Sequence, residues 1–333
     1  MKNYTITIDT GTTNTRVTLW DRERKALASA KSETGVRITA IEGRNSRLKQ
    51  EIRNCMDRVL EEKKLTFDDV ERVIASGMIT SNMGLVEIPH VYAPAGAKEL
   101  AQHARKVLIE EVCPIEILFV PGMKNKVETV TLLNFEGMDM MRGEEVEALA
   151  IMNHYPAGKP YLLVLPGSHT KFVSIDAEGR MTGCLTTITG ELLSVITNET
   201  LIADAVGHKF ASEETYDREM VLSGYRTAKA TGIGRACFSA RILNTFAEPD
   251  KEKIANFVLG AVLQNDIETA KNSSALKTAA DTTVVISGKN PLRKALMDLF
   301  KEDGTFVNIE EFVPSANVPL SAEGAFLVAD LVN

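Results

Sequence analysis

Residues 4–20 read YTITIDTGTTNTRVTLW, which describes a strand, a turn of small polar residues and a second strand. Tyr4, Ile6 and Ile8 alternate with threonines, and this period of two is typical of a half-buried strand. A tight hairpin needs only two turn residues, usually Asn-Gly or Asp-Gly. The additional residues of DTGTTN, one of them the acid Asp9, therefore predict a turn that holds a ligand.

The same pattern returns at residues 161–175, which read YLLVLPGSHTKFVSI. A third strand follows each copy, at residues 26–32 and near residues 181–188, so each copy predicts a three-stranded antiparallel meander. Backbone N–H groups in turns of Gly, Ser and Thr bind phosphate oxygens. Small polar turns also occur as plain connectors, and neither copy matches GxxxxGK[ST] or GxGxxG. Two such turns in repeated meanders favour a nucleotide site of another kind.

The rest of the chain alternates helical and strand patterns, which predicts an α/β layer structure with a mixed sheet. The expected helices cover residues 46–64, 97–112, 190–206, 216–230, 236–247, 252–271 and 321–332. The further expected strands cover residues 70–76, 115–120 and 283–286.

The composition of the 333 residues is that of a soluble protein of one large or two ordinary domains. The net charge of −7, from 38 basic and 45 acidic side chains, argues against a nucleic-acid or membrane surface. The start has no pattern of a secretory signal, and no apolar run approaches the length of a membrane span. Four scattered cysteines without metal spacing predict reduced, mostly buried thiols in a cytoplasmic protein.

Six stretches together make the chain resemble the 2-dehydro-3-deoxygalactonokinase family, sugar-acid kinases of the actin, sugar kinase and Hsp70 superfamily. They are residues 8–16 (IDTGTTNTR), 76–84 (SGMITSNMG), 141–145 (MRGEE), 165–172 (LPGSHTKF), 189–192 (TGEL) and, more weakly, 238–241 (FSAR). The chain departs from the family at Thr10, Leu85 and Phe172, where the family usually has tryptophan. These departures concern the exact substrate more than the reaction.

The resemblance implies two ribonuclease H-like, actin-like ATPase domains, each a mixed five-stranded sheet flanked by helices, with a cleft between them. We expect the domains to cover residues 1–156 and 157–333, with the last helix packing back on the first domain. The implied reaction uses ATP and Mg²⁺ to phosphorylate the terminal 6-hydroxyl of 2-dehydro-3-deoxy-D-galactonate.

By the same resemblance, the two turns hold the phosphates of ATP, and Asp9 holds Mg²⁺ through water. The implied phosphate-binding residues are Gly11, Thr12, Thr13, Asn14, Gly167, Ser168, His169, Thr170 and Lys171. Lys171 either pairs with phosphate or faces solvent. His169 suggests catalysis, but a histidine held by hydrogen bonds within its turn is the simpler interpretation.

The general base is expected at the start of a helix. Related sugar kinases carry a carboxylate in a pattern like Gly-Asp-Gln-x-Ala-Ala-Leu, and residues 143–149 read GEEVEAL. Glu144 is therefore the first candidate for the base, and Asp139 is the competing one. Acidic residues also occur routinely in a first helical turn without a catalytic role.

The substrate implied by the resemblance is a carboxylic acid, which a planar guanidinium binds through two parallel hydrogen bonds. Arg142 is the main candidate for that contact. Arg16 is its rival, or else an ion-pair partner in a strand. Ser81, Asn82 and Glu87 offer groups for the sugar hydroxyls. Gly288, after the strand at 283–286, is the candidate on the adenine side.

Two alternatives stay open at this stage. The chain is either a kinase for another sugar or sugar acid, or a nucleotide-gated switch or regulator without a small substrate. The expected partners are ATP and a small sugar acid, with a homodimer possible and with neither nucleic acid nor membrane bound.

Overall fold

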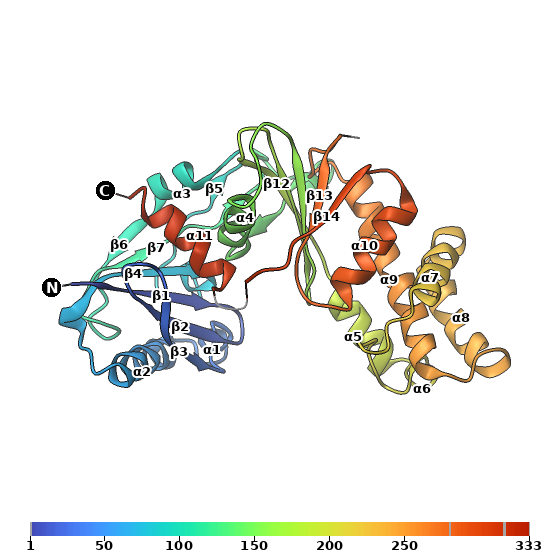
Figure 1. Ribbon diagram of the computed structural model, residues 1–333, viewed down its shortest axis with the longest axis horizontal. Coiled ribbons are helices and arrows are strands. Elements are labelled where there is room, and N and C mark those ends of the chain that lie inside the picture. The colour runs from blue at the N-terminus through green and yellow to red at the C-terminus, as the bar shows by residue number, and fades with distance from the viewer. Residues whose placement is uncertain (1, 280, 316–317, 333) are drawn as a thin grey trace.

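The computed structural model describes residues 2–279, 281–315 and 318–332, and it has two halves, each built around a β-sheet (Figure 1). The first half runs from blue to green and the second from green to orange. The last helix, α11 (Leu320–Ala329), returns to the first half and packs on α4 (Glu144–Met152). The end of the chain thus ties the two halves together.

The sheet of the first half has the strand order β3-β2-β1-β4-β7-β6. Its strands are β1 (Tyr4–Thr10), β2 (Thr15–Trp20), β3 (Ala26–Ser32), β4 (Val70–Gly77), β6 (Arg105–Val107) and β7 (Ile117–Phe119). β1 runs antiparallel to β2 and parallel to β4, so the carboxyl ends of β1 and β4 lie at one edge. Gly77 has φ +87, and a Cβ there would lie 2.7 Å from the Thr10 carbonyl oxygen, so that edge requires glycine.

The sheet of the second half has the order β12-β11-β10-β13-β14. Its strands are β10 (Tyr161–Leu165), β11 (Thr170–Ile175), β12 (Met181–Thr187), β13 (Thr283–Ile286) and β14 (Asn308–Glu311). Its pairing directions repeat those of β3-β2-β1-β4-β7. The expected mixed α/β fold is confirmed, but the expectation of five strands in the first sheet is wrong, because β6 adds a sixth.

A small third sheet joins the halves. Its strands are β5 (Val91–Tyr92), β8 (Met123–Lys124) and β9 (Met140–Met141). Ala95 and Met181 exchange two backbone hydrogen bonds of 3.0 and 2.8 Å. The Asn125 side chain donates to the Cys184 carbonyl and accepts from its N–H, both at 2.8 Å. These contacts cover the outer edge of β12, which would otherwise be unpaired, and we call them the β12 joint.

The remaining α-helices pack against the sheets or against one another. They are α1 (Arg37–Glu42), α2 (Ser46–Glu62), α3 (Ala97–His103), α5 (Thr189–Glu199), α6 (Ala203–Val206), α7 (Arg218–Thr231), α8 (Ile233–Phe246), α9 (Lys251–Asn272) and α10 (Leu292–Asp303). α2 covers the first sheet, and the buried α9 organises the core of the second half.

A buried apolar cluster continues from one half into the other through α4 and α11. It contains Trp20 from β2, Leu163 from β10 and Phe326 from α11. The Trp20 and Phe326 rings meet edge to face with centroids 5.5 Å apart. A Cβ on Gly324 would lie 1.8 Å from the Val146 carbonyl oxygen, so only glycine permits this close crossing of the two helices. The cluster therefore holds α4 at the boundary of the halves.

Several predicted boundaries are wrong. The helix expected at 97–112 ends at His103, and Arg105–Val107 becomes β6, because it pairs with the outer edge of β7. The helix expected at 190–206 is divided into α5 and α6. β14 was not predicted, since its sequence NIEE has no apolar alternation. α10 was also missed, although its buried residues recur at helical spacing.

Two further predictions concern cysteines and membranes. The four cysteines are unpaired and buried, as predicted. Within the described residues, the helices are all too short or too polar to cross a membrane.

Candidate active site

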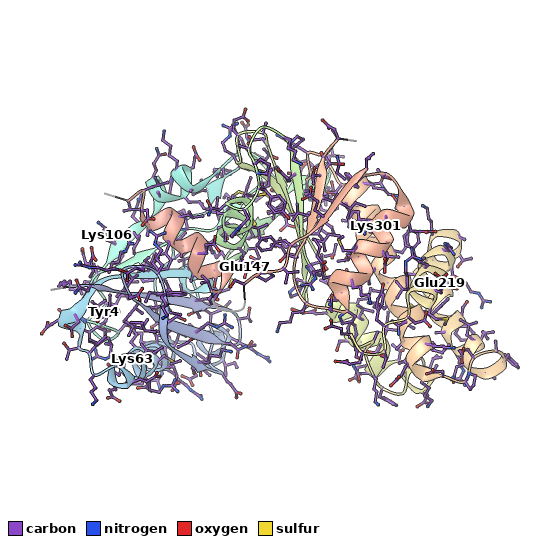
Figure 2. All side chains as sticks on the ribbon, viewed as in Figure 1. Tyr4, Lys63, Lys106, Glu147, Glu219 and Lys301 are labelled. Carbon is purple, nitrogen blue, oxygen red and sulfur yellow. The ribbon has the colours of Figure 1, made fainter. Side chains whose placement is uncertain are left out.

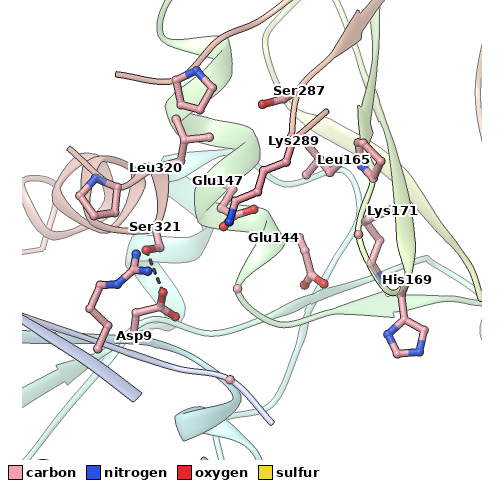
Figure 3. Close-up of a pocket in the computed structure, with 18 of the residues that line it drawn as sticks. Asp9, Glu144, Glu147, Leu165, His169, Lys171, Ser287, Lys289, Leu320 and Ser321 are labelled. Carbon is pink, nitrogen blue, oxygen red and sulfur yellow. Dashed lines mark hydrogen bonds between the residues drawn. The ribbon is translucent and has the colours of Figure 1, made fainter. Parts of the chain in front are cut away.

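The two repeated turns meet at one cavity of about 620 Å³ between the halves (Figure 3). Its lining includes Asp9 and Gly11 from the first turn and Gly167, Ser168, His169 and Lys171 from the second. Thr12 lines a second cavity, Thr13 and Asn14 line a third, and Thr170 is buried beneath its own turn. The structure therefore brings the two turns together, although not every predicted residue of each.

The first turn is an open backbone loop. The Gly11 N–H donates to the Asn14 carbonyl at 2.9 Å, and residues 11–14 are exposed. The Gly11 and Thr12 carbonyls accept from the Val36 and Arg37 N–H groups at 3.1 and 2.9 Å. Two carbonyls of the loop are thus directed toward α1, away from any phosphate.

The second turn is supported from behind. The Glu191 N–H at the start of α5 donates to the Ser168 carbonyl at 3.0 Å. A Cβ on Gly190 would lie 2.2 Å from the Gly167 carbonyl oxygen, so this approach requires glycine. His169 is exposed, and its Nε2 lies 3.0 Å from a Glu191 carboxylate oxygen. This contact holds the imidazole beside the start of α5.

A buried acid lies beneath the second turn. Asp266 on α9 is fully buried, and its Oδ1 accepts from the Thr187 and Thr189 hydroxyls at 2.7 and 2.5 Å. Burial raises its pKa, and the hydroxyls of Thr189, Thr187 and Thr170 oppose this shift. Asp266 thus anchors the strand end and the helix start that support the turn.

Three carboxylic acids of the first half line the cavity: Asp9, Glu144 and Glu147. Asp9 is the second-last residue of β1, and its Oδ2 accepts from the Ser321 hydroxyl at 3.0 Å. Burial raises the pKa of Asp9, while Ser321 and Arg16 lower it. Figure 3 shows Glu144 and Glu147 directed into the cavity from α4.

Glu147 is a residue that the sequence reasoning missed. Burial, then the nearby Asp9 and Glu144, raise its pKa to about 8. It lies three positions after Glu144, and residues at this spacing share one face of a helix. That spacing was the available signal. Figure 2 shows Glu147 near the meeting point of the two halves.

The start of α4 is fixed by Glu145, a glutamate that does not line the cavity. Both carboxylate oxygens of the fully buried Glu145 accept from the Gly143 N–H, at 3.0 and 2.8 Å. Burial, then Glu144, raise the pKa of Glu145 to about 8. Gly143 has φ +112, a conformation that glycine adopts without strain. Glu144 accepts from the Arg142 N–H at 3.1 Å.

Asp139 and Lys171 belong to the β12 joint. The Asp139 carboxylate accepts from the Thr186 N–H at 2.6 Å and from its hydroxyl at 3.1 Å, and it is absent from the lining of the cavity. Lys171 Nζ donates to the Met140 carbonyl at 2.9 Å and also to the Thr186 hydroxyl. It lies 3.9 Å from Asp139. Both side chains therefore hold β9 against β12.

A second cavity of about 1050 Å³ adjoins the first and contains the predicted sugar-acid residues Ser81, Asn82, Glu87 and Arg142. Arg16 lies instead in the first cavity, beside Asp9. Glu144 lines both cavities. It is thus located where the two spaces meet.

Arg142 is held rigidly in the second cavity. Its guanidinium donates to the Thr80 hydroxyl at 2.7 Å, to the Ile88 carbonyl at 2.8 Å and to His90 Nδ1 at 3.3 Å. Two of its five N–H groups have no acceptor among the described residues. Burial, then Arg142 and Lys124, lower the pKa of His90 to about 4. His90 and Lys124 line this cavity and were not predicted.

The end of β13 closes the first cavity from the second half. Ser287, Gly288 and Lys289 line it. Gly288 has φ +98, and a Cβ there would lie 2.9 Å from Pro166 of the second turn. The predicted adenine-side glycine thus lies against the second turn, next to a lysine that the sequence reasoning missed.

The donor set fits a hydrated magnesium ion and a phosphate chain. Carboxylate oxygens are the ligands that Mg²⁺ prefers, and Mg²⁺ commonly keeps several waters in nucleotide sites. No three His, Cys, Asp or Glu side chains within the described ranges lie close enough to hold a metal directly. An ion held by Asp9 through water stays a prediction. The exposed backbone of the two turns fits phosphate oxygens.

One curated relative resembles part of the chain. The chain is 32% identical over 134 residues to a Rhizobium meliloti protein named as a probable 2-dehydro-3-deoxygalactonokinase, DgoK1. That alignment covers 40% of this chain and 40% of the relative, so the match spans less than half of the relative's length.

Two solved structures share the fold. A candidate 2-dehydro-3-deoxygalactonokinase from Sinorhizobium meliloti has a TM-score of 0.72 at 19% identity, covering 98% of this chain and 97% of that chain. Component A of the (R)-2-hydroxyglutaryl-CoA dehydratase of Acidaminococcus fermentans has a TM-score of 0.50 at 13% identity, covering 99% of each chain. A family model described as 2-keto-3-deoxy-galactonokinase matches residues 9–313, and the chain therefore belongs to that family.

Proposed function

We propose that the protein is an ATP-dependent kinase that phosphorylates the terminal 6-hydroxyl of 2-dehydro-3-deoxy-D-galactonate. Family membership supports this reaction class. The observation that carries the proposal is that Glu144 lines both the cavity of the two turns and the cavity of Arg142. A base for phosphoryl transfer must contact the acceptor hydroxyl beside the phosphate.

In this proposal Glu144 accepts the proton of the 6-hydroxyl. Asp139 is the weaker candidate, because its carboxylate already accepts from Thr186 and lies outside the cavity. Arg142 binds the substrate carboxylate through its remaining N–H groups, while Thr80, Ile88 and His90 fix its orientation. Ser81, Asn82 and Glu87 bind the sugar hydroxyls.

The two turns bind the phosphate chain from opposite sides. Gly11, Thr12, Thr13 and Asn14 contribute from the first half, and Gly167, Ser168, His169 and Thr170 contribute from the second. Asp9 would hold Mg²⁺ through water, and the ion would supply positive charge beside the phosphoryl group. Gly288 borders the adenine side. Lys171 orients β9 and the Arg142 segment through the β12 joint.

We further propose that residues 1–156 and 157–333 are two ribonuclease H-like domains of the actin-like ATPase type. The repeated strand order supports this division. A cytoplasmic location and a homodimer stay predictions.

The test is ADP release by the purified protein with Mg²⁺ and ATP, measured against a panel of 2-keto-3-deoxy sugar acids, other sugar acids and neutral sugars. We expect turnover with 2-dehydro-3-deoxy-D-galactonate at a kcat/KM at least tenfold above that for neutral sugars, because they lack the carboxylate. Faster turnover with another member would identify a different sugar kinase. ATP hydrolysis unaffected by every acceptor would instead identify a nucleotide switch.

A further inference from the structure

The cavity between the halves has an uneven distribution of charge. The first half contributes the carboxylic acids Asp9, Glu144 and Glu147 to its lining. An ATP phosphate chain is itself strongly anionic, and like charges this close destabilise one another. A nucleotide can therefore occupy this cavity only if cations face the phosphates from the other side.

The cationic side chains of the cavity differ in how many hydrogen bonds and acidic neighbours they already have. Arg16 lies beside Asp9 and lowers the pKa of that acid and of Glu147. Arg142 is directed to Thr80, Ile88 and His90. Lys171 is nearly buried and bonded within the β12 joint.

Lys289 is the remaining cation of the lining. It follows Gly288 and is exposed, and its ammonium group forms no hydrogen bond or ion pair with another described residue. Figure 3 shows its side chain extending from the Ser287 end of β13 toward Glu147 on α4. The lysine thus reaches from the second half toward the acidic wall of the first.

The backbone that carries Lys289 is firmly held although its side chain is free. The Ser287 N–H donates to the Val164 carbonyl at 3.0 Å, and Arg293 Nη1 donates to the Gly288 carbonyl at 2.8 Å. Gly288 also packs on Pro166 of the second turn. The backbone at Lys289 is therefore held against the turn that borders the phosphates, so that only the side chain has to be ordered when its ammonium group binds.

We infer that Lys289, and not Lys171, is the lysine that binds the phosphate chain of the nucleotide. This inference rests on the proposed kinase function. In the protein without nucleotide the ammonium group lines the cavity and forms no ion pair with another described residue. With nucleotide it pairs with phosphate oxygens through charge-assisted hydrogen bonds.

The test is calorimetric binding of a non-hydrolysable ATP analogue, ADP and adenosine, each with Mg²⁺, to wild type and to K289A and K289Q. We expect about a 10- to 100-fold loss of affinity for the ATP analogue in both variants, the range for a lost charge-assisted contact. ADP affinity should fall by the same factor or less, and adenosine affinity should stay unchanged. K289R should keep most of the affinity for the analogue.

The matched control is K277A, which removes an exposed lysine far from the lining of the cavity. It should bind all three ligands like wild type. The thermal unfolding midpoints of all variants should match wild type, because Lys289 is exposed. If K289A or K289Q unfolds at a lower temperature than wild type, the comparison uses the stable variant of the two together with K289R, which keeps the charge of the side chain.

The outcomes separate the two proposals. If K289A and K289Q bind the ATP analogue as well as wild type does, the role of Lys289 is overturned. The kinase proposal then stays intact. An equal loss of adenosine affinity also overturns that role, because it indicates damage to the turn rather than to a phosphate contact. Wild type that binds no nucleotide overturns the kinase proposal itself.

Discussion

The two repeated turns share a backbone plan but differ in their chemistry. Across the first hairpin Asp9 is paired in register with Arg16, whereas across the second Leu165 is paired with Lys171. The acid of the first turn lines the cavity. Asp266, an acid beneath the second turn, is instead buried and accepts hydrogen bonds from threonine hydroxyls. In our proposal the first turn therefore holds the metal ion, and the second turn surrounds phosphate.

This difference shows how a duplicated fold divides its work. The two sheets repeat the same strand order, and each places a turn of small residues at the same position. The first half then adds α4, whose Glu144 and Glu147 extend the acidic wall. The second half adds Lys289 at the end of β13. The first half lines the cavity with both acids and arginines, whereas the described lining from the second half contains Lys171 and Lys289 and no carboxylic acid.

The largest expected effect tests the acidic wall. E144Q should lower kcat about 10²- to 10⁴-fold, because the amide cannot accept the proton of the substrate hydroxyl. Affinity for the ATP analogue should stay within a few-fold of wild type. Steady-state kinetics and calorimetry check this. A variant with wild-type kcat would show that Glu144 is not the base and would return Asp139 to first place.

The next effect concerns Asp9, the acid of the first turn, which has no counterpart in the second turn. D9N should raise the Mg²⁺ concentration needed for half-maximal rate about 10- to 100-fold, because a neutral amide holds a hydrated cation less strongly. D266N provides the comparison, since its side chain does not line the cavity. It should leave the Mg²⁺ requirement unchanged. An equal shift in both variants would contradict the division of labour between the turns.

A smaller effect is expected at the joint between the halves. D139N should lower the free energy of unfolding by about 1–3 kcal/mol, because an amide cannot accept all the hydrogen bonds that Thr186 and Met140 donate. Urea denaturation measures this change. The kcat of the folded fraction should fall by less than that of E144Q. A catalytic loss without a loss of stability would indicate that Asp139 acts in the chemistry.

The smallest effect is a dependence of stability on pH. The pKa of His90 is lowered from 6.5 to about 4, so between these values the unfolded chain binds more protons than the folded one. Stability from this residue is present above pH 6.5 and is lost as the pH falls toward 4. The effect should be about 1 kcal/mol, because His90 is partly exposed to solvent. H90N should flatten this part of the stability curve, and an unchanged slope would contradict the assignment.

The sequence by itself determined the repeated meanders, the mixed α/β fold and the two turns. These depend on local signals: the period of two in residues 4–8, and the Gly, Ser and Thr that fill the first turn of each copy. It also marked Glu144 and Arg142, because a short motif carried them. Glu147 could have been found from its helical spacing to Glu144.

The tertiary structure decided which charged groups are free. From the sequence, Asp139 and Glu144 are two acids five positions apart, and Lys171 and Lys289 are two lysines beside glycine-containing turns. Only the packing of β9 against β12 occupies Asp139 and Lys171, and only the return of α11 onto α4 holds Glu144 and Glu147 at the cavity. Such contacts join residues far apart in the chain. They depend on burial and geometry, which no local pattern of residues specifies.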